Sequence, residues 1–280
     1  MAFESRMDIW PRFDKYTPYS YRKFLERLHS GNRYSVLISS YAEKKITDPP
    51  KPLSKRDISR TDLSRQNVRF IENARETYET GLRVSSHVRP LLFHYSWHSF
   101  LAFLMYTILR FDGRAKGHGI TVSKMERNEI KLEFHPVNKR GFFQRVLDTL
   151  TILGYPSAFA RWIPVAEKNN ILIFVENPLS PFAKVKRIDL KDIITFDERN
   201  YLEKLCAQKL PIKNIHKYDL MEKCIRRFLV LFTASTITRY RPQICSDILA
   251  GEGEYESSIL TEVRGHMTPI LTSLTIYIIF

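Results

Sequence analysis

The most apolar segment of the chain runs from Leu91 to Leu109, nineteen residues without a formal charge. Pro90 suits the first turn of a helix, because the N–H that proline lacks would have no partner there. A helix that is apolar on every side has to be covered on every side. The pattern therefore predicts one long buried helix, at about residues 89–110, around which the rest of the chain packs.

The same segment is long enough to be tested as a membrane span. Its first half carries a run of polar or amphipathic side chains, from His94 to Ser99. In a bilayer these groups would lie in one leaflet, where unpaired polar groups cost free energy. We therefore expect a buried core helix and no membrane span.

Apolar residues spaced three and four positions apart predict further helices. They are expected at Tyr19–Leu28 with Ser20 as N-cap, Gln66–Leu82, Phe142–Leu153, Leu190–Gln208, Leu220–Arg239 with Pro242 ending it, and about Tyr255–Gly265. The helix at Gln66–Leu82 should run antiparallel to the central helix, because only a few residues join the two.

Strand patterns are few. Ile120–Lys124 and Glu129–Phe134 flank a polar turn, and the second run alternates apolar and charged residues, which predicts a β-hairpin. Ile171–Val175 is apolar throughout and fits either a buried strand or a helix fragment. The fold class expected is mainly α (α+β), with a basic N-terminal extension at 1–65 and a helical core domain at 66–280.

The charge of the chain directs attention to anionic partners. Lys and Arg number 44 against 30 Asp and Glu, a net charge of +14. Such a chain attracts polyanions, because neutralising phosphates releases condensed counterions. Nucleic acid is the first partner expected, with RNA favoured. The alternatives are a scattered basic surface without a specific partner and an anionic membrane surface.

The densest basic region extends from Lys44 to Arg69, with eight Lys and Arg against three acids. Either it contacts phosphates or it is a solvated loop. The candidates for nucleic-acid binding are Lys44, Lys45, Lys51, Lys55, Arg56, Arg60 and Arg65.

The three cysteines are far apart and form no Cys-x-x-Cys pair, so neither a zinc ribbon nor a disulfide framework is indicated. They are typical of reduced thiols in the cytosol, and the mixed charges of the N-terminus do not resemble a signal peptide. We expect a cytoplasmic protein.

Arg89 and His94 form an R-x4-H pattern at the start of the predicted central helix. Histidine titrates near neutrality and can move the proton of a 2′-OH, and arginine can stabilise the charge that builds on a phosphate. The alternative is an arginine that satisfies a helix end and a histidine that packs in the core. His94 and His98 share a helix face, but no nearby carboxylate completes a metal site, so neither a metal nor a cofactor is expected.

A second group of residues could contact an anion. The glycine-rich segment Phe111–Gly119 lacks the pattern of a phosphate-binding loop, so a plain turn is the alternative. The end of the helix before Pro242 carries two arginines. The candidates in these two places are Arg114, Lys116, His118, Arg239 and Arg241.

Four motifs occur in order along the chain: VRPLLFHY from Val88, His118-Gly119, Gly-Phe-Phe from Gly141, and LVLFTASTITRYRP ending at Pro242. Together they resemble the YaaC-like family of prokaryotic proteins. This resemblance implies a largely helical intracellular protein and assigns no activity. The R-x4-H pattern resembles that of HEPN ribonucleases, which are helical dimers that cleave RNA without metal.

Two functions are therefore expected from the sequence. The first is a nucleic-acid-associated protein, with activity as a metal-independent HEPN-like endoribonuclease of a defence or toxin type acting as a homodimer. The second is a non-catalytic adaptor that binds a protein partner. The first predicts RNA cleavage without divalent metal, and the second predicts an exposed apolar patch and no turnover.

Overall fold

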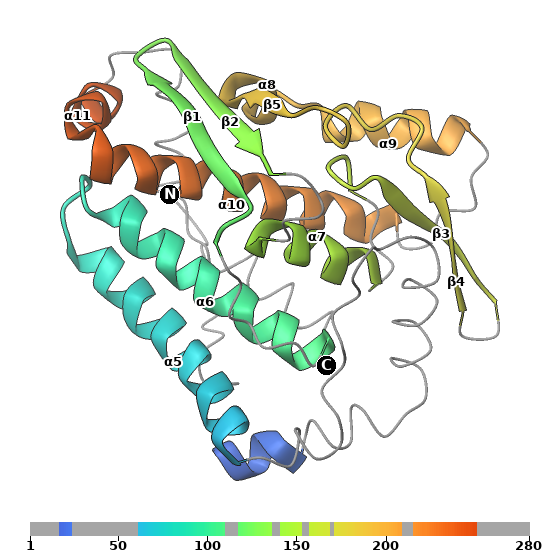
Figure 1. Ribbon diagram of the computed structural model, residues 1–280, viewed down its shortest axis with the longest axis horizontal. Helices are drawn as coiled ribbons and strands as arrows, with labels where there is room; N and C mark the ends of the chain where they lie inside the picture. The colour runs from blue at the N-terminus through green and yellow to red at the C-terminus, as the bar shows by residue number, and fades with distance from the viewer. Residues whose placement is uncertain are drawn as a thin grey trace, which may run out of the picture.

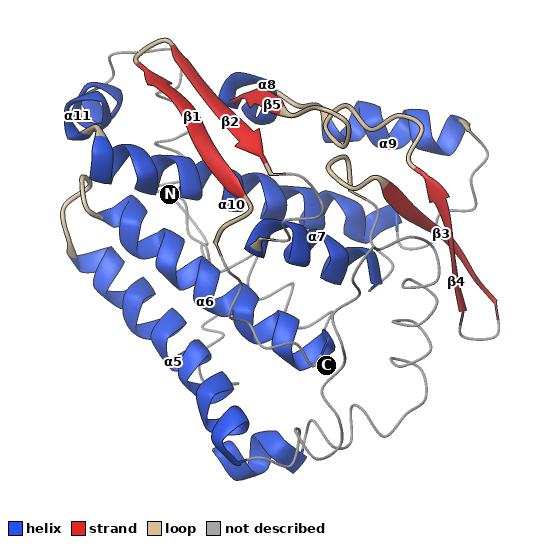
Figure 2. Ribbon diagram, viewed as in Figure 1, coloured by secondary structure: helices blue, strands red, loops and turns tan. Residues whose placement is uncertain are grey.

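A computed structural model describes residues 17–23, 61–109, 117–135, 141–152, 157–168, 171–208 and 215–250. Helices predominate, and two small antiparallel sheets lie against them (Figures 1 and 2). The predicted class, mainly α with a small β component, is confirmed. The predicted helix at Tyr255–Gly265 and most of the basic N-terminal region lie outside the described residues.

Helix α6, Arg89–Leu109, forms the centre of the described fold, as the apolar pattern predicted. Its side chains Trp97, Phe100 and Phe103 are almost completely buried. Helix α5, Thr61–Arg83, runs antiparallel along one side of it, and helix α10, Ile215–Tyr240, crosses another side (Figure 1). A helix without a polar face has to be covered in this way.

Helix α5 is longer than the sequence pattern indicated. It begins at Thr61, so the boundary drawn after residue 65 falls inside a continuous helix and not at its start. The Ser96 hydroxyl donates to the carbonyl oxygen of Ala74 at 2.6 Å and links α6 to α5. Gly81 lies against the ring of Phe93, where an added Cβ would approach ring carbons to 2.7 Å.

The first described segment is helical from residue 18 to residue 23. Thr17, and not the predicted Ser20, is its N-cap: the N–H of Ser20 donates to the Thr17 hydroxyl, and the Ser20 hydroxyl accepts from the Thr17 N–H. The buried Tyr21 joins this segment to α6 through a 2.7 Å hydrogen bond between its hydroxyl and that of Thr107.

The predicted hairpin is present as strands β1, Ile120–Glu126, and β2, Glu129–Phe134. Strand β5, Arg187–Asp189, adds to β2 and completes a three-stranded sheet. A second hairpin, β3 at Trp162–Lys168 and β4 at Ile171–Glu176, was not predicted as a pair, although its apolar second strand was one of the two alternatives for residues 171–175.

The helices after the first hairpin agree with the pattern in position but not always in extent. Helix α7, Phe142–Ile152, is confirmed. The single helix predicted over 190–208 is wrong: α8, Leu190–Ile194, ends at Thr195, and Asp197 caps a new helix, α9, Glu198–Ala207. Pro242 occupies the first position of α11, Pro242–Ala250, immediately after α10 ends.

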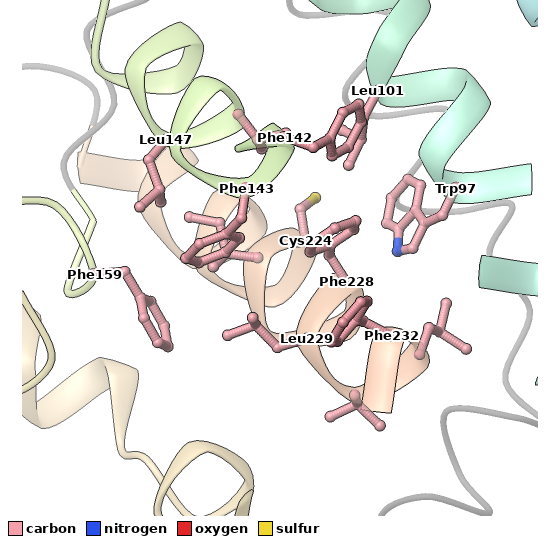
Figure 3. Close-up of a cluster of buried hydrophobic side chains, with 14 of the residues drawn as sticks. Trp97, Leu101, Phe142, Phe143, Leu147, Phe159, Cys224, Phe228, Leu229 and Phe232 are labelled. Carbon is pink, nitrogen blue, oxygen red and sulfur yellow. The ribbon is translucent and has the colours of Figure 1, made fainter. Parts of the chain in front are cut away.

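An aromatic cluster holds α6, α7 and α10 together (Figure 3). Phe143 of α7 stacks on Phe228 of α10, with ring centroids 5.9 Å apart and planes within 9°. Phe142, Leu101 and Trp97 fill the space between α7, α10 and α6 (Figure 3). Buried rings of this size contribute a large share of core stability and fix how the three helices sit.

The turn at Gly117–Gly119 packs directly on the first residues of α7. The N–H groups of Phe142 and Phe143 donate to the carbonyl oxygens of Gly117 and His118, at 3.0 and 2.9 Å. The backbones touch so closely that a Cβ on Gly141 would lie 2.0 Å from the nitrogen of Gly119. The two glycine motifs noted in the sequence thus form one contact, and it sets the position of His118.

None of the helices within the described ranges is both long and apolar enough to cross a membrane. For α6 this agrees with the expectation of a core helix drawn from its polar first half.

We expect Gly141→Ala to destabilise the protein by about 3 kcal/mol or more, because the new methyl group would meet backbone that has no side chain to move aside. Gly117→Ala is the matched control. It has open space around the added Cβ but a φ of +81°, so it should cost only about 1–2 kcal/mol. Urea denaturation of the three proteins measures both values, and equal losses would contradict the importance of the glycine contact.

Candidate functional site

Three histidines from two parts of the chain gather beside α10. His94 and His98 come from α6, and His118 comes from the turn that precedes β1. The distances between ring centroids are 6.2 Å for His94 and His98, and 5.8 Å from His118 to each of the other two. We call these three residues the histidine cluster.

Aromatic rings surround the cluster. His98 stacks on Phe142 with a centroid distance of 3.8 Å. Phe232 of α10 lies 5.1 Å from His118 and 5.6 Å from His94, measured between ring centroids. These phenylalanines pack against the imidazoles through van der Waals contacts. They offer no strong hydrogen-bonding group to the ring nitrogens.

Burial has left some of these nitrogens unsatisfied. The side chain of His94 is 0% exposed, and neither Nδ1 nor Nε2 has a hydrogen-bond partner among the described residues. Nδ1 of His118 is also buried without one. A buried polar atom without a partner costs about 1–3 kcal/mol. The unpaired nitrogens of the cluster therefore lower the free energy of unfolding.

The surroundings keep all three imidazoles neutral at physiological pH. Burial lowers the pKa of His98 to about 4, with the nearby His118 adding to the effect. Burial also lowers the pKa of His94 well below its usual value, and then His98, His118 and Arg239 lower it further. For His118, burial is again the main cause of a lowered pKa, followed by Arg239. Neutral imidazoles can accept protons.

Arg239 is the arginine whose charge acts on the cluster. It lies in the last turn of α10, where its Nε donates to the carbonyl oxygen of Ser235 at 3.1 Å and its guanidinium lies over the ring of Tyr240. Its exposure to solvent leaves the rest of the guanidinium accessible to an anion. Arg241, the next basic residue, is exposed between α10 and α11.

Arg89, the other half of the R-x4-H pattern, is engaged elsewhere. Its Nε donates to the carbonyl oxygen of Gly81 at 3.1 Å, and its Nη2 donates to that of Val84 at 3.1 Å. It thus satisfies carbonyls at the end of α5. Residues five apart on a helix lie about 140° apart around its axis, so the local geometry of α6 does not by itself bring Arg89 and His94 together.

Some of the other candidate residues lie within the described residues and some lie outside them. Arg65 lies exposed on α5. The remaining candidates lie outside the described residues: Lys44, Lys45, Lys51, Lys55, Arg56, Arg60, Arg114 and Lys116. Among the predicted residues that the structure describes, it brings together His94, His118 and Arg239.

Within the described ranges, no group of three or more His, Cys, Asp or Glu is arranged to hold a metal ion. For the histidine cluster the spacing gives a reason. Around a tetrahedral zinc, with Zn–N bonds of 2.0–2.1 Å, two histidine ring centroids would lie about 5 Å apart. The three rings here are more widely spaced.

Sequence reasoning did not place His98 among the site residues, nor did it find the aromatic partners Phe142 and Phe232. The i, i+4 spacing of His94 and His98 was a usable signal, because it puts both on one helix face. The third imidazole could not be found in this way, since only the tertiary packing brings the 117–119 turn to α6.

Comparison with known proteins finds no match for this chain among family models, curated proteins or solved structures. The resemblance to the YaaC-like family therefore stays a prediction.

The neutral cluster predicts a loss of stability in acid. Well above pH 6.5 the imidazoles are neutral in both folded and unfolded chains. As the pH falls from 6.5 to about 4, the unfolded chain takes up a proton at His98 that the folded chain does not, so stability is lost over this window. For His98 alone the loss is about 3 kcal/mol.

His98→Phe should remove this contribution while keeping the stack on Phe142. Urea denaturation at several pH values between 7 and 4 measures the slope for the parent and the variant. His87→Ala, at an exposed histidine, is the control and should leave the slope unchanged. Parallel curves for the parent and His98→Phe would contradict the prediction.

Proposed function

We propose that the protein is a nucleic-acid-associated enzyme that cleaves RNA without a metal ion, with the histidine cluster as its proton-transfer site. The observation that carries the proposal is the meeting of three neutral imidazoles with Arg239, whose charge acts on two of them. The net charge of +14 supports an anionic substrate.

The cleavage needs one group to accept a proton and another to donate one. A neutral imidazole takes the proton of the 2′-OH, the 2′ oxygen forms a bond to phosphorus, and the bond from phosphorus to the 5′ oxygen breaks. A second imidazole, protonated, donates to the leaving 5′ oxygen. The products are a 2′,3′-cyclic phosphate and a 5′-OH, so atoms and charges balance without a metal.

Binding of RNA would favour the protonated imidazole that serves as the general acid. A phosphate beside His118 and Arg239 offsets the positive charge of the arginine and favours the protonated imidazole, so it raises the histidine pKa. Arg239 then stabilises the charge that builds on the phosphate. His98 and His118, which are only partly buried, are assigned the contacts with RNA, and the fully buried His94 acts behind them.

This assignment keeps the acid–base chemistry expected from the R-x4-H pattern, but Arg239 takes the place of Arg89 as the arginine that stabilises the phosphate. Arg89 has a structural role in it, because its guanidinium holds the end of α5. The fold of HEPN ribonucleases and membership of the YaaC-like family are not required by the proposal. The three free cysteines support a reducing compartment such as the cytoplasm.

The test is incubation of a mixed single-stranded RNA pool with the purified protein in excess EDTA. We expect cleavage that leaves 2′,3′-cyclic phosphate ends and that falls at least about a hundredfold in His118→Ala and in His98→Ala, the usual scale for losing a general acid or base. Arg239→Ala should cause a comparable loss, and Arg239→Lys a smaller one.

Two controls separate this proposal from its competitors. His87→Ala, at an exposed histidine outside the cluster, should keep full activity. Arg89→Ala should lower stability by about 1–2 kcal/mol through its lost hydrogen bonds yet keep activity at temperatures where it remains folded. Loss of activity in folded Arg89→Ala with full activity in Arg239→Ala would reinstate the original R-x4-H pair. Intact RNA with the parent protein would overturn the proposal.

The second candidate is a non-catalytic adaptor, and one observation favours it. Leu82 is 47% exposed, Val88 43% and Tyr240 65%. The turn between α5 and α6 and the C-terminal end of α10 lie at the same end of the molecule (Figure 1). Exposed apolar groups at one end suit a protein partner or a second copy. Intact RNA in the cleavage assay, together with a single species at the dimer mass in light scattering that Leu82→Ser with Val88→Ser shifts to monomer, would support the adaptor over the ribonuclease.

A further inference from the structure

A cleft separate from the histidine cluster lies between the end of β2, one side of α7 and residues 182–186. Its volume is about 270 Å³, close to the lower end of the range of about 300–1,000 Å³ for ligand pockets. Such a space takes a ligand the size of one nucleotide and not a dinucleotide. Its lining falls into an aromatic half and a basic half.

The aromatic half is a stack of phenylalanines. Phe159 and Phe182 stack with centroids 4.5 Å apart, and Phe143 meets Phe159 edge to face. Phe134, at the end of β2, lies 5.4 Å from Phe143 between ring centroids and is only partly buried. Its free surface can receive a planar ring. Stacking on an aromatic side chain is how proteins hold unpaired bases without reading their sequence.

The basic half comes from the segment that carries Lys184 and Lys186, whose side chains are 72% and 68% exposed. Each pairs with a carboxylate that already serves another cation. Glu176 contacts both Lys184 and Arg161, and Glu133 contacts both Lys186 and Arg187.

Four cations thus share two carboxylates, an excess of two positive charges in this group, and of its members Lys184 and Lys186 line the cleft itself. Exposed ion pairs of this kind contribute little stability, so a lysine can exchange its carboxylate for a phosphate at small cost. His135 and Gln144, which also line the cleft, add polar groups beside the same opening.

We propose that this cleft binds a nucleobase together with its phosphate. The ring stacks against Phe134, and Lys184 and Lys186 contact the phosphate. The ligand is either a free mononucleotide or an unstacked nucleotide of single-stranded RNA, since the two share this chemistry. The proposal does not rest on RNA cleavage, because a protein without turnover could use the cleft in the same way.

The test is calorimetric binding of four probes to the full chain: AMP, adenosine, inorganic phosphate, and a short 2′-O-methyl oligoadenylate that cannot be cleaved through its 2′-OH. We expect AMP or the oligonucleotide to bind, with adenosine and phosphate alone each at least about tenfold weaker, as the loss of either a phosphate contact or a stacked base implies. Using an uncleavable RNA separates this result from the outcome of the cleavage assay.

Two variants place the binding in the cleft. Phe134→Leu keeps an apolar side chain on β2 but removes the aromatic face, and the double variant Lys184→Ala with Lys186→Ala removes the cations. Each should weaken binding about tenfold, and the lysine variant should also flatten the dependence on salt. Lys204→Ala, at an exposed lysine on α9, is the matched control and should bind as the parent does.

Each outcome decides the question. Binding of AMP that both cleft variants weaken supports a mononucleotide site, and binding of the oligonucleotide alone with the same losses supports a site for RNA. Failure of both probes to bind overturns the proposal. So does binding that both cleft variants leave unchanged, or binding of inorganic phosphate as tight as that of AMP.

Discussion

The constraint on which the described fold depends is that α6 has no polar face to turn toward water. Its apolar surface has to be covered on nearly every side, and α5, α7 and α10 provide that cover. Two of the polar side chains that α6 carries, Ser96 and His94, are buried with it. Ser96 finds a partner in the carbonyl of Ala74, whereas His94 finds none. The candidate site is thus a consequence of how the core is built.

How much of this could be read from the sequence depends on the range of the interactions involved. Helix α6 and the hairpin of β1 and β2 follow from local periodicity, so they were predicted. Strand β5 is only three residues long, and β3 contains Pro164, so neither carries a clear strand pattern. The break between α8 and α9 depends on Asp197 as a cap, a signal present in the sequence but outweighed by the surrounding apolar residues.

The candidate functional site depends even more on contacts between residues far apart in the sequence. Spacing alone proposed Arg89 as the partner of His94, yet the arginine whose charge reaches that ring is Arg239, far along the chain. Only packing of α10 against α6 could bring them together. The place of Lys184 and Lys186 beside the cleft could not be predicted, because nothing in a short basic run shows that phenylalanines lie next to it. Local patterns find elements, and tertiary contacts decide which side chains meet.

A core selected only for stability would not keep the histidine cluster, since its neighbours are phenylalanines and a further apolar ring would avoid the unpaired nitrogens. The cluster is also joined to the cleft through α7. Phe142 stacks on His98, the next residue lines the cleft, and the N–H groups of both hold the turn that carries His118. A ligand that shifts Phe143 would act on the N–H group that holds His118 and, through the neighbouring Phe142, on the ring stacked against His98. Because such coupling is reciprocal, we expect protonation of the cluster and occupation of the cleft to influence each other.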